Sequence, residues 1–338
     1  MRLHHLLPLP MLMYAAIACA EPDTAPADPV PGYFSFNFEN DFYFDSDDGY
    51  SNGFQFAWAR GTFDQFGGTN TKALTAFLAP SWIKAGKGYQ RAVTHKLGNV
   101  MFTPDDLKAA VPPPGDVPYS GTTYWRTDWL RFNEKVVDRA WGTIGIVGPA
   151  SGSQSLQEHM HTVIGATYPN GWDTQLRNEP VFELGVVRDW RVAVRGTEDS
   201  GSDVVLITSG NIGNLSTRLD AGVVVRSGHN LFRSFPAVGV LPGREVNPVA
   251  GATVDTAHVF LGAMYRYEAW NIALDGNISD PSGSTIHRVP NQFYVSIGGS
   301  WNMGSFGFLV SFAESTKRFE EADAGDSFGS MSVTWRYR

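Results

Sequence analysis

Residues 33–39 read YFSFNFE, and this short stretch decides the fold. The phenylalanines from Phe34 to Phe38 alternate with a serine, an asparagine and a glutamate. Successive side chains of a β-strand point to opposite faces, so the pattern predicts a strand with one apolar and one polar face. The same alternation returns in residues 50–61 and, near the end of the chain, in residues 331–337.

Such two-faced stretches recur along the whole chain. Strands are expected near residues 32–41, 50–61, 91–102, 119–132, 136–147, 179–193, 202–212, 216–227, 255–278, 288–301, 305–316 and 326–338. Bacterial single-chain barrels have even numbers of strands, which favours keeping 255–278 as one long strand rather than splitting it at Glu268. The prediction is therefore twelve strands.

The alternation fits either a soluble sandwich, whose apolar faces pack together, or an outer-membrane barrel, whose apolar faces meet lipid. An export leader, strands of ten or more residues and aromatic residues at strand ends favour the barrel. Beyond the N-terminus no apolar run approaches ~18 residues, which excludes a bundle of membrane-spanning helices. The sequence thus predicts an all-β fold, a twelve-stranded antiparallel transmembrane β-barrel over residues 32–338.

The N-terminal segment has the features of a signal peptide over residues 1–20: an arginine, an apolar stretch and a small-residue cleavage site. Cys19, the only cysteine, leaves a lipidated cysteine as the alternative, disfavoured because Ala16 stands where a leucine is usual. Four prolines predict an extended tether over residues 21–31. Removing the leader leaves 25 basic against 34 acidic residues, a net charge of −9, which argues against a nucleic-acid partner.

The connections between strands divide into two sets if the chain enters the barrel from the periplasm. Residues 42–49, 103–118 and 148–178 then lie on the external rim, and the long segments 62–90 and 228–254 on the periplasmic side. Outer-membrane barrels usually have short periplasmic turns, and no chemical role is assigned to these two segments. The residues that can carry chemistry lie on the external connections.

The first external connection is dense in carboxylates and amides, beginning at Asn40 and Asp41 and continuing with three aspartates up to Asp48. Such oxygen ligands suit Ca²⁺, although the spacing is not that of an EF-hand, and a solvated acidic hairpin tip is the alternative. Residues 49–53 also fit the G-x-S-x-G pattern of a nucleophile elbow. That pattern requires a strand turning into a helix, whereas here an alternating strand follows, so we reject the elbow. By alternation Ser51 is expected to face the lumen.

The second external connection is predicted to contain a short helix that starts at Ser155, in capping-box spacing with Glu158, and ends near Gly165. Gln157 and His161 are four residues apart and share one face of this helix. Another face of the helix is expected to be apolar, formed by Leu156, Met160 and Val163. His159 is expected to point well away from Gln157. The pair can direct an amide and an imidazole at one atom, or His161 can simply face water. The third candidate, residues 171–180, leads into the sixth strand and reads as a rim turn ended by Pro180.

Taken together, these elements resemble the lipid A 3′-O-deacylase family of outer-membrane enzymes, from about residue 33 to the end of the chain. The motifs that carry the resemblance are, in chain order, Glu39-Asn40-Asp41, Tyr50-Ser51-Asn52-Gly53, Thr103-Pro104, Pro118-Tyr119-Ser120-Gly121, residues 145–149, Gln157-x-x-x-His161-x-x-x-Gly165, Gly171-Trp172 and residues 175–180. The resemblance implies a twelve-stranded barrel with a calcium-dependent site at its outer rim. The implied reaction is hydrolysis of the ester that holds the 3′ acyl group on the glucosamine backbone of lipid A.

The resemblance also implies residue roles. His161 resembles the catalytic base, and Asn40, Asp41, Ser51 and Gln157 resemble the calcium and oxyanion environment. A histidine can remove a proton from water, and a bound calcium can neutralise the developing oxyanion. The implied partners are lipid A or lipopolysaccharide and outer-membrane lipids, and the chain is expected to be a monomer in the outer membrane of a Gram-negative bacterium.

Some positions depart from the family pattern. Ser51 stands where the family has threonine, Thr167 where some members have a carboxylate, and Val117 where an arginine commonly precedes Pro-Tyr. Lys108 is the expected substitute for this arginine. Lys108 and Glu179, which lies in the segment 171–180, are the two residues expected to contact the substrate. The chain also ends in Arg338 rather than in an aromatic residue.

Two other classes of function remain open. One is an outer-membrane phospholipase with Ser51 as nucleophile and His161 as base, which predicts fluorophosphonate labelling of Ser51 and turnover without calcium. The other is a non-catalytic barrel, a surface-binding protein or a small pore, whose ligand binding or conductance would survive loss of His161. The pore ranks lowest, because a narrow twelve-stranded lumen lined with serine, glutamine, arginine and glutamate is expected to be filled.

Overall fold

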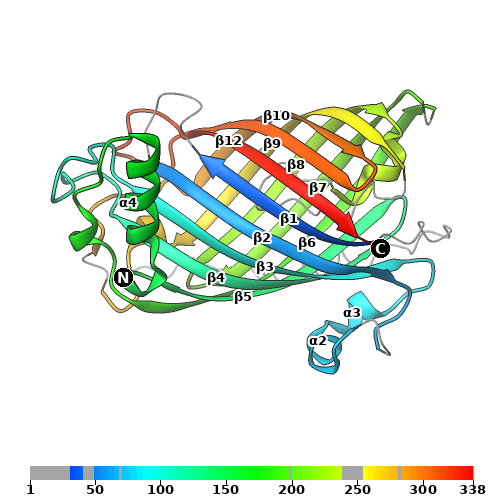
Figure 1. The fold of residues 1–338 in the computed structure, drawn as a ribbon, viewed down its shortest axis with the longest axis horizontal. Helices are drawn as coiled ribbons and strands as arrows, with labels where there is room; N and C mark the ends of the chain where they lie inside the picture. Colours follow the sequence, from blue (N-terminus) through cyan, green and yellow to red (C-terminus); the bar gives the residue numbers. More distant parts are fainter. Residues whose placement is uncertain are drawn as a thin grey trace, which may run out of the picture.

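The computed structural model describes residues 31–40, 49–67, 71–197, 199–237, 254–280 and 283–337, with only the backbone course for residues 49–52 and 235–237. Within these residues twelve antiparallel strands form one closed barrel, in which β1 pairs with β12 (Figure 1). The strands are β1 (Pro31–Asn40), β2 (Gly49–Phe63), β3 (Gln90–Thr103), β4 (Ser120–Phe132), β5 (Val136–Val147), β6 (Glu179–Gly196), β7 (Gly201–Gly213), β8 (Ser216–His229), β9 (Thr256–Asn271), β10 (Asn291–Met303), β11 (Phe306–Ser315) and β12 (Ser327–Tyr337). The helices are α2 (Ala73–Leu78), α3 (Ser81–Lys84), α4 (Ser153–Ile164) and α5 (Ile272–Asp275), with 3₁₀ turns η2 (Pro149–Ser151), η3 (Trp172–Thr174) and η4 (Leu231–Ala237).

The predicted strand count is confirmed, and one strand end is wrong. The ninth strand was expected to run to residue 278, but β9 ends at Asn271 and α5 follows at once. The Asn271 side chain accepts a hydrogen bond from the Ala273 backbone N–H at 3.1 Å, which caps this helical turn. The barrel begins at Pro31, one residue earlier than expected, because Pro31 pairs with Gly61. The predicted leader and the rest of the tether lie outside the described residues.

The two faces of the strands meet different surroundings. Ser35 and Asn37 of β1 point inward and are fully buried. Phe34 of the same strand points outward and is 42% exposed, although β1 is flanked by β2 and β12. The outward series of β10 is more exposed still, with Phe293 and Ile297 each nearly 60% exposed. An apolar face turned outward around a polar interior is the arrangement of a barrel in lipid, so the sandwich alternative is wrong. Among the described residues no helix is long and apolar enough to cross a membrane.

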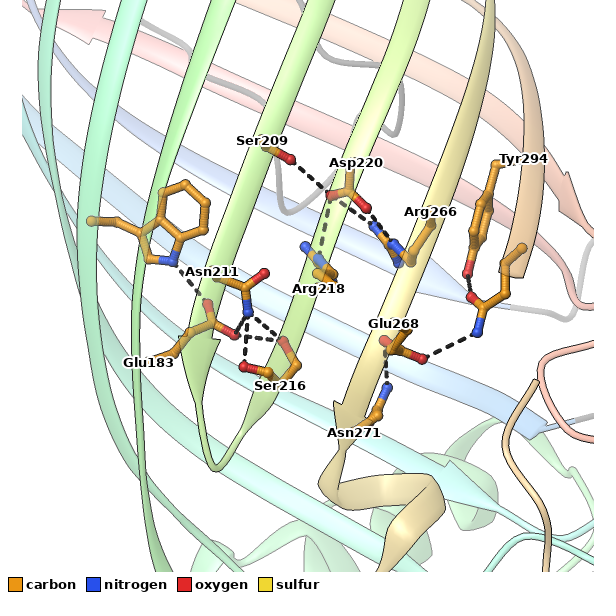
Figure 2. Close-up of polar contacts among 12 residues, drawn as sticks. Glu183, Ser209, Asn211, Ser216, Arg218, Asp220, Arg266, Glu268, Asn271 and Tyr294 are labelled. Atoms are coloured by element: carbon orange, nitrogen blue, oxygen red, sulfur yellow. Dashed lines mark hydrogen bonds and ion pairs between the residues drawn. The ribbon is translucent and has the colours of Figure 1, made fainter. Parts of the chain in front are cut away.

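Polar side chains fill the lumen and bind one another. Figure 2 shows Glu183 of β6, whose carboxylate accepts hydrogen bonds from Trp141 Nε1, Asn211 Nδ2 and Ser216 Oγ at 2.7–2.8 Å. On the neighbouring strands Asp220 and Arg266 form an ion pair of 2.7 Å (Figure 2). Such cross-strand contacts occupy the barrel interior, so the interior is built mainly as a polar core.

A second inward cluster is the ion-paired group around Asp128 of β4. Its carboxylate contacts Lys96 Nζ at 2.9 Å and Arg126 Nε at 2.7 Å, and all three side chains are buried. A buried carboxylate between two cations is strongly coupled to both, because removing it leaves two charges without water.

Replacing Asp128 tests whether this cluster stabilises the barrel. We expect Asp128→Ala to lower the free energy of unfolding by about 3–5 kcal/mol, since Lys96 and Arg126 lose their buried counter-charge. The measurement is urea unfolding of the protein in phospholipid vesicles, followed by tryptophan fluorescence. Exposed Asp323 offers the control, and Asp323→Ala should change stability by no more than about 0.5 kcal/mol. Equal effects of the two substitutions would contradict the prediction.

The two ends of the barrel carry different additions. Helix α4 lies at the end where β3 finishes and β4 begins, and α2 and α3 lie toward the opposite end, where the C-terminus is found (Figure 1). The connections predicted to be external therefore share one end, and the long segments after β2 and β8 share the other. Most of the acidic connection after Asn40, residues 41–48, lies outside the described residues, as does most of 228–254.

Candidate functional site

Helix α4 is the element that holds the two polar residues singled out by the sequence. It ends as predicted, at Gly165, whose φ of +72° is the left-handed conformation that glycine adopts readily. Its predicted start is wrong, because the helix begins at Ser153, after Gly152, without a side-chain cap. The expected capping partner Glu158 instead accepts a hydrogen bond from Gln154 one turn earlier, at 3.0 Å, and Ser155 is an exposed residue inside the helix.

The helix is seated on the outer face of the barrel wall. Outward-facing Asn99 of β3 donates to Ser153 Oγ at 2.8 Å, and outward-facing Thr123 of β4 donates to the Ser151 carbonyl at 2.7 Å. Two residues before Thr123, on the same face of β4, lies Gly121, where an added Cβ would come within 2.1 Å of Ser153. The site therefore lies between a helix and the lipid-facing side of the wall, at the rim, rather than inside the lumen.

The close approach at Gly121 gives a test of this seat. We expect Gly121→Ala to push α4 off the wall, because Ser153 belongs to the first turn of the helix and its backbone has to move. The matched control is Gly142→Ala on the outward face of β5, where a new Cβ meets Leu184 at an ordinary 3.5 Å. Limited proteolysis at residues 153–165 measures the effect: cleavage should rise severalfold in the first variant only, with both barrels intact by heat-modifiable gel mobility. Unchanged cleavage in Gly121→Ala would show that α4 is not seated there.

Gln157 lies on the wall side of α4 and is only 1% exposed. Its Oε1 accepts a hydrogen bond of 2.7 Å from Trp172 Nε1, and Trp172 is itself buried against Tyr119, with ring centroids 5.1 Å apart. An indole N–H can only donate, so the glutamine oxygen must face Trp172. The Gln157 Nε2 has no hydrogen-bond partner among the described residues. This N–H₂ group is buried between α4 and the wall, so the side chain holds an unpaired donor rather than a surface-exposed one.

His161 follows Gln157 by one helical turn and is partly exposed. Its Nδ1 lies 2.5 Å from the backbone oxygen of Thr167, which the turn at Gly165 brings back toward the helix. A carbonyl oxygen can only accept, so Nδ1 carries the proton in the neutral ring and Nε2 keeps a lone pair. Thr167, where the resemblance implied a carboxylate in some family members, therefore contributes through its backbone and orients the imidazole.

The other helix positions agree in part with the sequence. Leu156 packs on the apolar cluster of Met101, Leu107, Tyr119 and Trp172, and His159 is exposed away from Gln157, as expected. The apolar stripe does not continue as predicted, because Val163 is 71% exposed in the last turn, beyond this cluster.

The first predicted connection reaches the same side of the wall. Backbone pairs link Asn40 to Asn52, Asn52 to Met101 and Met101 to Gly121, one lateral row across β1 to β4. With ~4.8 Å between neighbouring strands, Asn40 lies about 14 Å along the wall from the strand that seats α4. Asn40 is therefore at the rim level of α4, and Asp41 follows it outside the described residues.

Ser51 lies between Tyr50 and Asn52, where β2 gains one residue relative to β3. Such a bulge interrupts the alternation of side chains, so the parity that predicted a lumen-facing hydroxyl does not extend to this residue. Its side chain lies outside the described part of the chain.

The two predicted substrate residues lie in different surroundings. Lys108 is exposed on the connection of residues 103–118, and its carbonyl accepts a hydrogen bond of 3.2 Å from Asn170 Nδ2, on the loop after α4. The Glu179 carboxylate is largely buried and accepts hydrogen bonds from Ser279 N at 2.9 Å and Ser279 Oγ at 2.5 Å. Val117, which replaces a family arginine, is buried against Leu274 and Phe319.

No three histidine, cysteine, aspartate or glutamate side chains are grouped for metal binding among the described residues. Among the described residues at the rim, the Asn40 side-chain amide offers an oxygen, and Asp41 follows Asn40 in the chain. A hard cation with six to eight oxygen ligands would therefore need the acidic segment 41–48 as well. The described residues fit one edge of such a site and do not complete it.

A family model described as "Outer membrane protein LpxR" matches residues 9–337. The chain belongs to the LpxR family. The predicted membership of the lipid A 3′-O-deacylase family is thereby confirmed, as is the location in the outer membrane of a Gram-negative bacterium.

A solved structure with a TM-score above 0.5 shares the fold. The chain is similar to LpxR from Salmonella typhimurium, with a TM-score of 0.74 and 17% identity over 90% of this chain and 100% of that one. Weaker likenesses reach the β domain of the Bordetella autotransporter BrkA (TM-score 0.42, 8% identity, 91% and 98% coverage) and the translocator domain of NalP from Neisseria meningitidis (TM-score 0.37, 9% identity, 91% and 88% coverage). No curated protein sequence matches the chain.

The structure adds contacts at the candidate site that the sequence did not predict. Trp172 fixes the oxygen of Gln157, whereas the sequence placed it in a simple rim turn. Asn99 and Thr123 seat the helix from the wall, and their only signal in the sequence was a polar residue on the outward face of a strand.

Proposed function

We propose that this chain hydrolyses the 3′-O-linked acyl or acyloxyacyl ester of lipid A in the outer leaflet, with His161 activating the water. The observation that carries the proposal is the hydrogen bond from His161 Nδ1 to the Thr167 carbonyl, one helical turn from the buried, unpaired Gln157 amide. Family membership supports the substrate class, and the outer-wall position supports a lipid substrate.

In the proposed reaction His161 Nε2 accepts a proton from a water molecule as its oxygen attacks the ester carbonyl carbon. The carbonyl oxygen becomes an oxyanion, to which Gln157 Nε2 donates a hydrogen bond, and Asn40 is the second group proposed to face it. The imidazolium then returns its proton to the 3′ oxygen of the sugar as the carbon–oxygen bond breaks. The products are a free carboxylic acid and a 3′-hydroxyl group, and no serine nucleophile is needed.

We propose Ca²⁺ as the cofactor, held by Asn40, Asp41 and Ser51 with further acidic residues of segment 41–48. When bound, it supplies positive charge that polarises the ester carbonyl. Gln157 was also predicted as a ligand, but its oxygen binds Trp172, and this arrangement supports a role as hydrogen-bond donor.

The position of the site on the outer wall supports reaction without extraction of the lipid. Val163 and Ile164 at the end of α4 are more than 60% exposed and can contact acyl chains. Lys108 is the proposed cation for a lipid A phosphate. Glu179 is left out of the mechanism, because its carboxylate already ties β6 to the loop at Ser279. We propose that the enzyme acts as a monomer.

Replacing the two histidines of α4 tests the base. Lipid A from cells that express the wild type should lose its 3′ acyl or acyloxyacyl unit, seen by mass spectrometry. We expect His161→Ala to lower the rate about 10²–10⁴-fold, because proton transfer from water is lost. His159→Ala, on the exposed side of the same helix, should keep wild-type activity. Intact lipid A with the wild type would favour the non-catalytic barrel, and full activity of His161→Ala would remove the proposed base.

Chelation tests the cofactor separately. Purified protein treated with a calcium chelator should lose activity in lipid A micelles and regain it when Ca²⁺ is added back, because the carbonyl loses its cationic partner. Asp41→Asn should raise the calcium concentration needed for half-maximal activity. Activity that persists in chelator, together with labelling of Ser51 by a fluorophosphonate, would instead support the phospholipase-like mechanism.

A further inference from the structure

The segment between β2 and β3 forms a small helical hairpin, α2 and α3, on the outside of the barrel wall (Figure 1). Its inner side packs on outward-facing residues of the wall. The apolar cluster consists of Phe63, Ala79, Ile83, Val93, Trp129 and Ala140, with Phe66, Trp82 and Val186 at its edge. Trp129 Nε1 also donates a hydrogen bond of 3.0 Å to the Thr75 carbonyl of α2. The hairpin is therefore attached to the lipid-facing side of the barrel, at the end opposite α4.

Two arginines hold the end of α3 and the turn after it against the wall. Arg91 is 3% exposed and donates to six backbone carbonyls, among them those of Lys84, Ala85 and Gly86 at 2.7–3.0 Å. Arg131 donates to the Ala85 carbonyl at 3.2 Å and pairs with buried Asp138 at 2.8 Å. This many charge-assisted contacts fix the position of the hairpin on the wall.

The side of α2 that faces away from the wall is apolar and uncovered. Leu74, Phe77 and Leu78 follow the i, i+3, i+4 spacing of one helix face, and they are 68%, 78% and 54% exposed. The barrel wall near the hairpin is itself membrane-facing, with Leu97 and Trp125 each about 40% exposed. The apolar face of α2 therefore continues the lipid-facing surface of the barrel.

The depth of the hairpin matches the edge of a membrane. Val93 and Trp129, which it covers, are three residues from the ends of β3 and β4. At ~3.3 Å per residue the hairpin overlaps the last 10 Å or so of the strands. Helices that lie in a membrane interface bury their apolar face about 5–10 Å into the boundary between headgroups and acyl chains.

The charge of the hairpin is the opposite of that of the chain. Residues 64–89 contain Lys72, Lys84 and Lys87 with a single acid, Asp64, in a protein of net charge −8. All three lysines are exposed, whereas Asp64 is engaged by Gln90 Nε2 at 2.9 Å. Exposed lysines beside an apolar helix face are complementary to anionic phospholipid headgroups.

We propose that α2 and α3 form a phospholipid-binding element in the inner leaflet of the outer membrane. Leu74, Phe77 and Leu78 lie among acyl chains, and Lys72, Lys84 and Lys87 bind the phosphates of anionic phospholipid. The hairpin anchors the periplasmic end of the barrel, while α4 lies at the lipopolysaccharide leaflet. The proposal uses the fold and the outer-membrane location and does not depend on the deacylation reaction.

A depth measurement with the whole protein tests the apolar face. In a Cys19→Ser background, single cysteines replace Phe77 and, as the matched control, Glu134 in the exposed turn at the same end of the barrel. Each is labelled with an NBD fluorophore and reconstituted into phosphatidylethanolamine–phosphatidylglycerol vesicles. Phospholipids brominated on the acyl chains should quench the label at 77 at least threefold more than the label at 134. Phe77 is largely free of protein contacts, so both variants should keep heat-modifiable mobility.

The lysines are tested with the same label at position 77. Brominated phosphatidylglycerol should quench it at least twofold more than brominated phosphatidylethanolamine at equal mole fraction. In a Lys72→Gln, Lys84→Gln, Lys87→Gln variant this preference should disappear. Equal quenching by the two lipids in the unmodified hairpin would overturn the lysine–phosphate contact.

Two results would contradict the contact between the apolar face of α2 and acyl chains. A label at 77 that is quenched by aqueous iodide as strongly as the label at 134, and not by bromine, would place the face in water. Self-quenching at 77 that grows with the protein-to-lipid ratio, without bromine quenching, would show that a second copy covers the face. Either result would overturn the lipid proposal, and neither would bear on lipid A hydrolysis.

Discussion

A barrel in lipid must satisfy every backbone polar group within its own sheet, because no water reaches the hydrocarbon layer. The pairing of β1 with β12 closes the sheet and meets this constraint, and the outward side chains are then free to be apolar. The same constraint controls polar side chains on the outer wall, which need a partner supplied by the protein. At one end Asn99 and Thr123 bind the first turn of α4 and the turn before it, and at the other end Arg91 and Arg131 bind the carbonyls after α3. Helix α4 at one end and the hairpin of α2 and α3 at the other therefore each cover polar side chains on the outer wall and bind them.

The sequence predicted the strands well because alternation reports directly on a wall with two different faces. It is less informative where local backbone geometry overrides the pattern. Asn271 caps α5 and ends β9, and Gly152 rather than Ser155 precedes α4. At Ser51 one extra residue in β2 forms a bulge that the surrounding alternation cannot reveal, and the lumen-facing hydroxyl stays a prediction.

The site was predictable as a set of residue types and less so as a geometry. The four-residue spacing of Gln157 and His161 is enough to place them on one helix face. Gln157 is oriented by the indole of Trp172, fifteen residues later in the chain, and His161 by the backbone carbonyl of Thr167. Every residue has a backbone carbonyl, so the sequence does not show which one is the partner. In the sequence, Thr167 differs from the carboxylate of some family members, although the main chain at that position supplies an acceptor for His161. The hairpin of α2 and α3 was missed for a related reason, because its function depends on which face the wall covers.

The pairing of Gln157 with Trp172 shows how one fixed donor assigns the chemistry of its neighbour. A glutamine in water exchanges its oxygen and nitrogen freely, and either end can face a substrate. A buried indole N–H removes that freedom, because leaving it unpaired costs about 1–3 kcal/mol. The amide oxygen is drawn to Trp172 and the N–H₂ group is turned the other way before any ligand arrives. A donor that is already oriented need not reorganise when negative charge develops on an ester oxygen, and this is the condition under which a single hydrogen bond contributes most to catalysis.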